Sequence, residues 1–325
     1  TKLDGDGIFG MILNEGKGTN ADGNESNLGF PGRLKAKKSV FSFGNKIICI
    51  GTDISSIDEK NPTQTNIFQS FLTDTKISLS TSGEIIKKFP YEGKLKKDSK
   101  SGNWLIDPYG NGYHILSDTP VQIKKANQQS YHNGYSINTG QINNPKGAKE
   151  TVGNFASAWI NHGMAPKDAS YQYVIYPFLN QDDQNNFGKK IKKDESFEIK
   201  RADSIPHIVL NKETSTTAYV VFGANQNLEK EILKEVSAPA LVMISHKDRN
   251  SVTISAVQPD LNFPEYKPGK FRNYSQAVEL KITLEGKWDN LPENFIKKVE
   301  VSGNTTIITL ECIDGLPREF KMNKL

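Results

Sequence analysis

The stretch that decides the fold is NFASAWINHGMAPKDASYQYVIYP, from Asn154 to Pro177. Its first half, Phe155 to Ile160, has apolar side chains at both alternating sets of positions, which predicts a strand that is buried on both faces. Its second half, Tyr171 to Tyr176, is rich in aromatic and β-branched residues, which favour a pleated, packed surface. Pro177 has no amide hydrogen with which to continue a ladder, so the second strand should end before it. Two long strands in mid-chain indicate the centre of a β-sheet domain.

Hairpin patterns extend this β organisation along the chain. The clearest runs from Val40 to Ile50, where two β-rich segments are joined by Gly44-Asn45, a two-residue pair that accepts positive φ. A second hairpin is expected from Trp104 to Leu116, around a longer turn that contains Pro, Gly and Asn. Short apolar strands are expected at intervals up to residue 322.

The strand pattern restarts after residue 237. A short linking helix is expected at Leu228 to Val236, and a loop or short helix at residues 180–196. The chain has 325 residues, which is more than one compact core usually needs. The sequence therefore predicts an all-β protein, with a large antiparallel β-sandwich at residues 1–236 and a smaller antiparallel β-sandwich at residues 237–325.

Composition argues against several classes of protein. The 41 basic and 37 acidic residues give a net charge of +4, too small an excess to indicate nucleic-acid binding. No apolar run of about 18 residues is present, so no membrane partner is expected. Cys49 and Cys312 each lie in an apolar alternating run and are expected to be buried thiols rather than a disulfide. Without a Cys/His cluster, neither a metal site nor another cofactor is expected.

The common catalytic motifs are missing, including the GxSxG nucleophile elbow, the P-loop and the dinucleotide fingerprint. Among the five histidines, His132 with Tyr135 could perform acid/base chemistry if the tyrosine pKa were lowered. We favour the simpler interpretation of a polar loop with one aromatic anchor, because nothing nearby completes a site. His162, at a predicted strand end, is expected to cap backbone groups or to pack.

Lysine clusters could attract an acidic polymer by raising its local concentration. The cluster formed by Arg33, Lys35, Lys37 and Lys38 is the best candidate for a substrate-facing surface, because it enters a hairpin and would be held rigidly. A solvated face remains the plain alternative for every cluster. The other two clusters are Lys94, Lys96 and Lys97, and Lys189, Lys190, Lys192 and Lys193.

Four motifs, taken in order, resemble polysaccharide lyase family 8. Lys38 to Ile54 resembles a family segment that reads KS-aromatic-x-F…I-x-x-L-G-x-x-I. Trp104 to Tyr113 is similar to the family's next hairpin, and Ala158 to Tyr173 resembles its signature AW-I-x-HG…P…Y-x-Y. Gln258 to Asn262 is similar to a segment of the family's last domain. The resemblance runs over most of the chain and is greatest to lyases of the chondroitin sulfate ABC type.

The resemblance implies β-elimination on glycosaminoglycans that contain uronic acid: chondroitin or dermatan sulfate, or hyaluronan. Such lyases neutralise the uronate carboxylate, remove the C5 proton and expel the 4-linked oxygen. It also implies that the catalytic His, Tyr and Arg belong to an N-terminal α/α-toroid and the catalytic Glu to the early central sandwich, all expected before Thr1. No catalytic residue is therefore assigned, and His132 and Tyr135 do not correspond to the family's pair.

We therefore expect a C-terminal β-sandwich portion of a lyase that supports the substrate cleft and is inactive by itself. Its expected partners are the polysaccharide and the catalytic domain of the same protein, and the substrate class implies a secreted or periplasmic location. One alternative is a non-catalytic sandwich that binds sulfated polysaccharide through Lys35, Lys37 and Lys38. Others are a purely structural domain, or an enzyme that uses His132 and Tyr135.

Overall fold

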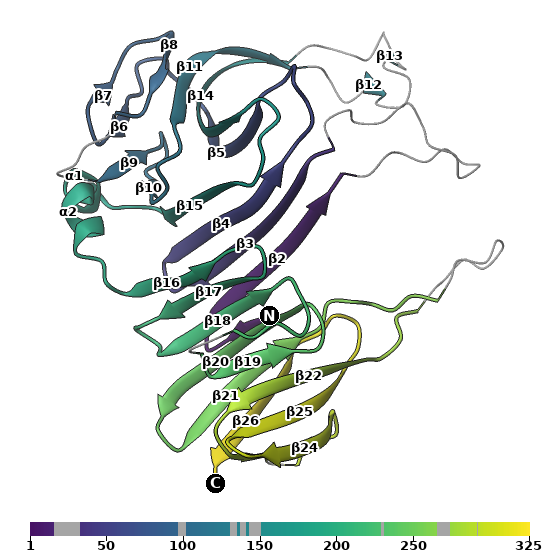
Figure 1. The fold of residues 1–325 in the computed structure, drawn as a ribbon. Coiled ribbons are helices and arrows are strands. Elements are labelled where there is room, and N and C mark those ends of the chain that lie inside the picture. Colours follow the sequence, from purple (N-terminus) through teal and green to yellow (C-terminus); the bar gives the residue numbers. More distant parts are fainter. Residues whose placement is uncertain are drawn as a thin grey trace. The chain divides into compact units, whose positions relative to one another are not determined.

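The structure is a computed structural model, and it describes residues 1–15, 33–96, 102–130, 135–136, 141–142, 151–228, 231–264, 274–290 and 292–325. Strands dominate the described part of the chain, so the all-β prediction is confirmed (Figure 1). Two short helices, α1 (Gln181–Asn185) and α2 (Phe187–Lys192), lie where a loop or short helix was predicted. Neither has the length or the hydrophobicity that crossing a membrane requires.

The chain forms two compact units, and each is assembled from separate stretches of sequence. Unit 1 consists of Thr1–Ile12, Lys37–Thr52 and Asp194–Leu325, and unit 2 of Leu13–Ala36 and Asp53–Lys193. Three long strands contribute residues to both units: β2 (Asp6–Asn14), β3 (Lys35–Phe43) and β4 (Lys46–Ser55).

Strands β3 and β4 are neighbours in one sheet and form the hairpin predicted from Val40 to Ile50. Gly44, in the turn between them, has a φ of +55°, a conformation that glycine adopts without steric cost. The local sequence pattern was therefore sufficient to predict this element.

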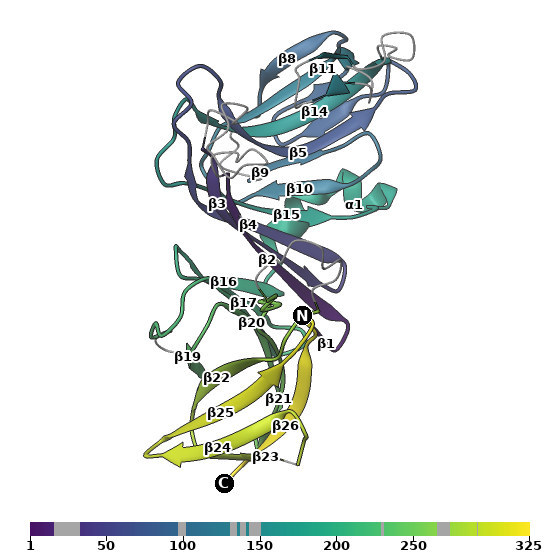
Figure 2. The ribbon, with the colours of Figure 1, turned by 90° about the vertical axis from the view of Figure 1, so that its right-hand side faces the viewer.

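Unit 1 contains two facing sheets (Figures 1 and 2). The seven-stranded sheet has the order β16 (Phe197–Ala202), β17 (Pro206–Asn211), β18 (Thr216–Val221), β20 (Ala240–Asp248), β21 (Ser251–Val257), β26 (Arg318–Lys324) and β23 (Trp288–Asn290). The four-stranded sheet has the order β19 (Leu233–Val236), β22 (Val278–Glu285), β25 (Thr305–Cys312) and β24 (Ile296–Ser302).

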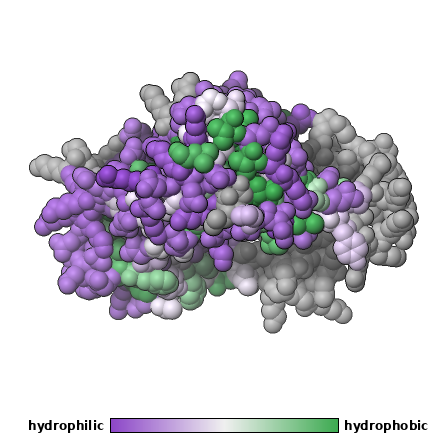
Figure 3. Space-filling model, turned by 90° about the horizontal axis from the view of Figure 1, so that it is seen from below, coloured by the Kyte–Doolittle hydropathy of each residue, from purple (hydrophilic) through white to green (hydrophobic). Residues whose placement is uncertain are grey.

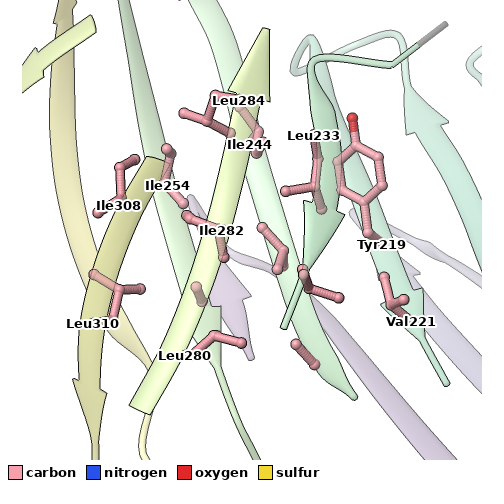
Figure 4. Close-up of a cluster of buried hydrophobic side chains, with 14 of the residues drawn as sticks. Tyr219, Val221, Leu233, Ile244, Ile254, Leu280, Ile282, Leu284, Ile308 and Leu310 are labelled. Atoms are coloured by element: carbon pink, nitrogen blue, oxygen red, sulfur yellow. The ribbon is translucent and has the colours of Figure 1, made fainter. Parts of the chain in front are cut away.

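The core of unit 1 lies between these two sheets. Side chains alternate between the two faces of a strand, so every second residue points into the gap. Ile282 on β22 and Ile308 on β25 belong to the same buried cluster as Ile244 on β20 and Ile254 on β21 (Figure 4). All four are fully buried, and Cys312 joins them as a buried free thiol, as predicted for both cysteines.

The other face of the seven-stranded sheet is buried as well. Val220 on β18 and Met243 on β20 point away from the core cluster, yet each is at most 1% exposed. Gly10 on β2 lies directly against Val220, because a Cβ at Gly10 would be 2.6 Å from Val220 Cγ1. The carboxylate of Asp6 accepts a hydrogen bond of 2.7 Å from the side-chain amide of Asn211. The N-terminal strands therefore cover this second face.

The predicted linking helix at residues 228–236 is wrong. Leu233–Val236 forms β19, which pairs antiparallel with β22. Leu233 and Val236 are at most 1% exposed, so burial in the core between the sheets outweighs a local helical pattern. The predicted domain boundary near residue 237 stays a prediction, although β18 and β20, from either side of it, pair within one sheet.

Unit 2 also contains two main sheets. One contains, in this order, β15 (Ala169–Tyr176), β10 (Gly112–Ile115), β9 (Asn103–Ile106), β6 (Leu79–Thr81) and β7 (Ile85–Ile86). These strands belong to a nine-stranded sheet that also includes β1 (Lys2–Leu3), β2, β3 and β4. The other has the order β5 (Thr63–Phe71), β14 (Thr151–Gly163), β11 (Val121–Ser130) and β8 (Tyr91–Lys94). A two-stranded ladder, β12 (Tyr135–Ser136) and β13 (Gln141–Ile142), completes the described elements.

The stretch at the centre of the prediction forms β14 and β15, and β15 ends before Pro177 as expected. The expectation that Phe155 to Ile160 is buried on both faces is wrong for one face. Phe155 and Trp159 are only half-buried, as is common for the outer face of an antiparallel sheet. The residues of the inner face are fully buried: Ala156, Ala158 and Ile160.

The side of the molecule seen in Figure 3 is mostly hydrophilic, with hydrophobic residues in separate groups. Among the described residues of unit 2, the charged side chains of Asp107 and Lys125 are buried. Lys125 on β11 is fully buried and donates to the carbonyl of Ile77 at 2.7 Å and to those of Thr75 and Lys87 at 3.4 Å. Burial lowers the pKa of Lys125 below its ordinary value.

Replacing a side chain in the core of unit 1 tests this packing. We expect Ile282→Ala to lower the free energy of unfolding by about 2–5 kcal/mol, because it removes buried methyl groups and leaves a cavity. Urea unfolding followed by far-ultraviolet circular dichroism measures the change. Val301→Ala, at a β24 position that is 44% exposed, is the control and should change stability by less than about 1 kcal/mol. Equal effects of the two substitutions would contradict the packing described here.

Candidate functional site

The four basic residues predicted to face a substrate lie at and before the start of β3. Arg33 precedes the strand with a φ of +44°; Arg33 and Lys35 are exposed, whereas Lys37 and Lys38 are half-buried. Because side chains alternate along a strand, Lys35 and Lys37 point to one side of β3 and Lys38 to the other. The four cations therefore do not form a single row, and their contact with substrate stays a prediction.

Lys37 is held in place by residues of unit 1. Its Nζ donates to the carbonyl of Ser204 at 2.5 Å and lies 6.0 Å from the centroid of the Phe222 ring. A cation above an aromatic ring at an exposed site contributes about 0.5–1 kcal/mol. The ammonium group thus has a defined position, with part of its hydrogen-bonding capacity already in use.

A buried histidine lies next to this segment. His207 on β17 is fully buried, with its Nδ1 2.7 Å from Ser39 Oγ on β3 and its Nε2 3.0 Å from Thr52 Oγ1 on β4. Its ring packs edge-on against Phe222, with the centroids 5.0 Å apart. A ring with no exposed surface cannot reach a substrate, so His207 fixes the positions of β3 and β4.

The other histidines singled out from the sequence do not form a reactive cluster. His162 Nε2 lies 2.9 Å from Thr65 Oγ1, and its ring is 6.3 Å from that of Tyr171, which confirms the expectation that it packs. His132 and the side chain of Tyr135 lie outside the described residues. Within the described ranges, no group of three or more His, Cys, Asp or Glu is placed to hold a metal ion.

Sequence reasoning missed a buried polar network in unit 1. Glu231 is 9% exposed; its carboxylate accepts a hydrogen bond from Tyr219 at 3.1 Å and lies 2.6 Å from the Lys200 ammonium. Burial, followed by the charge of Glu231, raises the pKa of Tyr219 well above its ordinary value. Burial also lowers the pKa of His246, against the smaller opposing effect of Glu231. Glu231 falls just before β19, where the sequence predicted a helix, so no local pattern indicated these contacts.

The arrangement near the start of β3 suits the binding of an anion. The lysines near the start of β3 can donate hydrogen bonds to carboxylate or sulfate groups. His207 and Tyr219, by contrast, have no exposed surface. The described surface of β3 is therefore the best candidate for contact with an acidic polymer.

Comparison with known proteins gives a consistent result. The sequence pattern of the polysaccharide lyase family 8 super-sandwich domain matches residues 3–187. The chain is 33% identical to a chondroitin sulfate ABC endolyase of Proteus vulgaris, over 91% of this chain and 27% of that protein. It is 28% identical to a chondroitin sulfate ABC exolyase of Bacteroides thetaiotaomicron, over 98% of this chain and 29% of that protein. The chain thus spans less than a third of the length of these two relatives.

Among solved structures, a xanthan lyase of Paenibacillus superposes with a TM-score of 0.72 and 17% identity. The match covers 100% of this chain and 28% of the xanthan lyase. At this identity, the similarity shows the fold alone.

Removing one hydroxyl beside His207 tests its role in holding β3. We expect Ser39→Ala to lower the free energy of unfolding by about 1–3 kcal/mol, because a buried ring nitrogen loses its hydroxyl partner. Guanidinium unfolding measures the change. Ser42→Ala is the same substitution at an exposed position of the same strand and should have an effect within about 0.5 kcal/mol of zero. A Ser39→Ala protein as stable as the parent would show that His207 does not hold β3.

Proposed function

The chain belongs to polysaccharide lyase family 8, and on that premise we propose that it is the β-sandwich portion of a lyase that cleaves glycosaminoglycans by β-elimination. The observation that carries this proposal is the match of residues 3–187 to the family's super-sandwich domain. It is supported by relatives whose names describe lyases of chondroitin sulfate. The proposed substrate is chondroitin or dermatan sulfate, or hyaluronan.

In this proposal the sandwich supports one wall of the substrate cleft, and the reactive groups belong to another domain of the same protein. The rigid placement of Lys37 supports the first part, because a fixed cation can orient a uronate or sulfate group at a lower entropic cost than a mobile one. The second part is supported by the relatives, because this chain spans less than a third of the length of each of the two chondroitin lyases compared above. The proposed substrate class implies a secreted or periplasmic location, which we include in the proposal.

The alternative function is a sandwich module that binds sulfated polysaccharide without taking part in catalysis. The same lysines near the start of β3 would support it. Affinity without any turnover, even when the remaining domains of the protein are present, would favour this alternative.

Turnover by the chain itself is the first test. We expect no increase in the ultraviolet absorbance of unsaturated uronate when the chain is incubated with chondroitin sulfate, because the proposal assigns the reactive groups to another domain of the protein. A full-length chondroitin lyase under the same conditions is the positive control. A clear increase that scales with the amount of chain would show that these residues contain the reactive site.

Binding through β3 is the second test. We expect replacement of Arg33, Lys35, Lys37 and Lys38 by Gln to weaken the affinity for chondroitin sulfate about tenfold or more at low salt, because four cations are lost. Replacing Lys189, Lys190, Lys192 and Lys193 by Gln removes the same charge from the α2 region and should change affinity by less than about threefold. Isothermal titration calorimetry measures both. If both variants lost the same affinity, the lysines near β3 would contribute only non-specific charge, and the predicted binding through β3 would be wrong.

A further inference from the structure

Unit 1 contains a hollow that the proposed function does not use. It has a volume of about 580 Å³, within the range of small-ligand sites. Its wall is contributed by four separate parts of the fold: β19, the β22–β23 connection, the β24–β25 turn and the end of β26. The residues that matter here are Lys234, Glu285, Lys287, Trp288, Asn304 and Lys324, which we call the lysine hollow. None of them lies within residues 3–187.

Positive charge in the lysine hollow is not fully balanced. Glu285 forms an ion pair with Lys234 at 3.0 Å. The hydrogen bond from Lys234, and then its positive charge, lower the pKa of Glu285 below its ordinary value. Lys287 and Lys324 are exposed and have no carboxylate partner among the residues that the structure describes. Glu231 also borders the hollow, but its carboxylate is paired with Lys200 at 2.6 Å. Lys287 and Lys324 therefore carry the surplus positive charge. A ligand must therefore offer hydrogen-bonding groups as well as negative charge.

The floor of the hollow is formed by Trp288, which is 7% exposed and belongs to the core cluster of unit 1. The Trp288 indole N–H donates to the carbonyl of Glu285 at 2.6 Å, and the Trp288 amide donates to Thr306 Oγ1 at 2.9 Å. Gly286 has a φ of +93°, and a Cβ there would lie 3.0 Å from the indole nitrogen. A side chain at Gly286 would be strained and would crowd the indole nitrogen, so glycine permits this close approach.

Donors and acceptors occur side by side in this wall. Asn304 Nδ2 donates to Glu285 Oε1 at 2.7 Å, and Glu285 Oε2 is paired with Lys234 at 3.0 Å. Each of these oxygens has a second lone pair, and the Asn304 carbonyl oxygen can also accept a hydrogen bond. A simple polyanion would be repelled by Glu285, whereas sugar hydroxyls can donate to it. The two unpaired lysines suit a carboxylate or sulfate on the same sugar. This combination of groups matches an acidic sugar better than it matches a phosphate or an apolar ligand.

We propose that the lysine hollow is a second binding site for one acidic sugar unit, a uronate or a sulfated hexosamine, of a polysaccharide chain. The sugar class rests on the proposed function, while the need for both an anion and hydroxyl groups rests on the residues of the hollow. Two linked sites on one polymer raise the overall affinity for long chains above that for short ones. The lysine hollow would therefore hold one part of a long polysaccharide while another part of the same polysaccharide leaves and rebinds its other site.

The test uses the whole isotope-labelled chain and a chondroitin sulfate tetrasaccharide. We expect the indole N–H signal of Trp288, assigned with a Trp288→Phe protein, to shift in a saturable way. The double substitution Lys287→Gln with Lys324→Gln should weaken this binding about tenfold, because two charged hydrogen bonds are lost. Lys281→Gln with Lys321→Gln removes the same charge from exposed positions on β22 and β26 and should change it less than twofold.

Two further probes define the ligand. An uncharged tetrasaccharide should not shift the Trp288 signal, and inorganic sulfate should shift it at least tenfold more weakly than the acidic tetrasaccharide. The proposal is overturned if the Trp288 signal does not respond to the acidic tetrasaccharide. It is also overturned if both double variants bind it equally, or if sulfate alone binds as well. Because the readout is local to the hollow, these results are independent of turnover and of the lysines near β3, on which the proposed function is tested.

Discussion

Burial of the seven-stranded sheet on both faces is the constraint on which unit 1 depends. One face packs on the four-stranded sheet through Ile244 and Ile254, and the other carries Val220 and Met243 beneath the N-terminal strands. Each large aliphatic side chain removed from water contributes about 1.5–3 kcal/mol, so neither cover can be lost without exposing a large apolar area. This explains why segments from distant parts of the sequence belong to one unit. It also explains the rigid position of Lys37, whose neighbours on β3 are part of that cover.

Local patterns in the sequence predicted most strands, because the alternation of side chains and the turn residues act over short distances. The hairpin at Gly44 and the end of β15 before Pro177 are examples. The failures arose where tertiary contacts decide the outcome. Leu233 and Val236 form a strand because β22 and the core lie beside them, and Trp159 is half-buried because one face of its sheet is open. The local sequence shows neither the pairing of β19 with β22 nor which face of the Trp159 sheet is covered.

The candidate sites show the same division. The basic residues from Arg33 to Lys38 are adjacent in sequence and were found by inspection. The contact between Ser39 and His207 joins residues 168 positions apart, and the lysine hollow combines four separate parts of the fold. Such constellations have no periodicity or spacing by which a single sequence could reveal them. Only the pairing of strands brings their members together.

The discontinuous make-up of the two units has a consequence for dissecting the protein. Unit 1 requires Thr1–Ile12 and Lys37–Thr52 in addition to Asp194–Leu325, and unit 2 takes the stretches between. No single truncation therefore releases an intact half. A fragment that began at residue 194 would leave the Val220 face of its sheet uncovered, and an apolar surface of that kind favours aggregation. By contrast, a chain that is cut once at an internal position can stay assembled, because the paired strands hold the two pieces together. A protein that behaves as one molecule under native conditions can therefore still have a cleaved backbone.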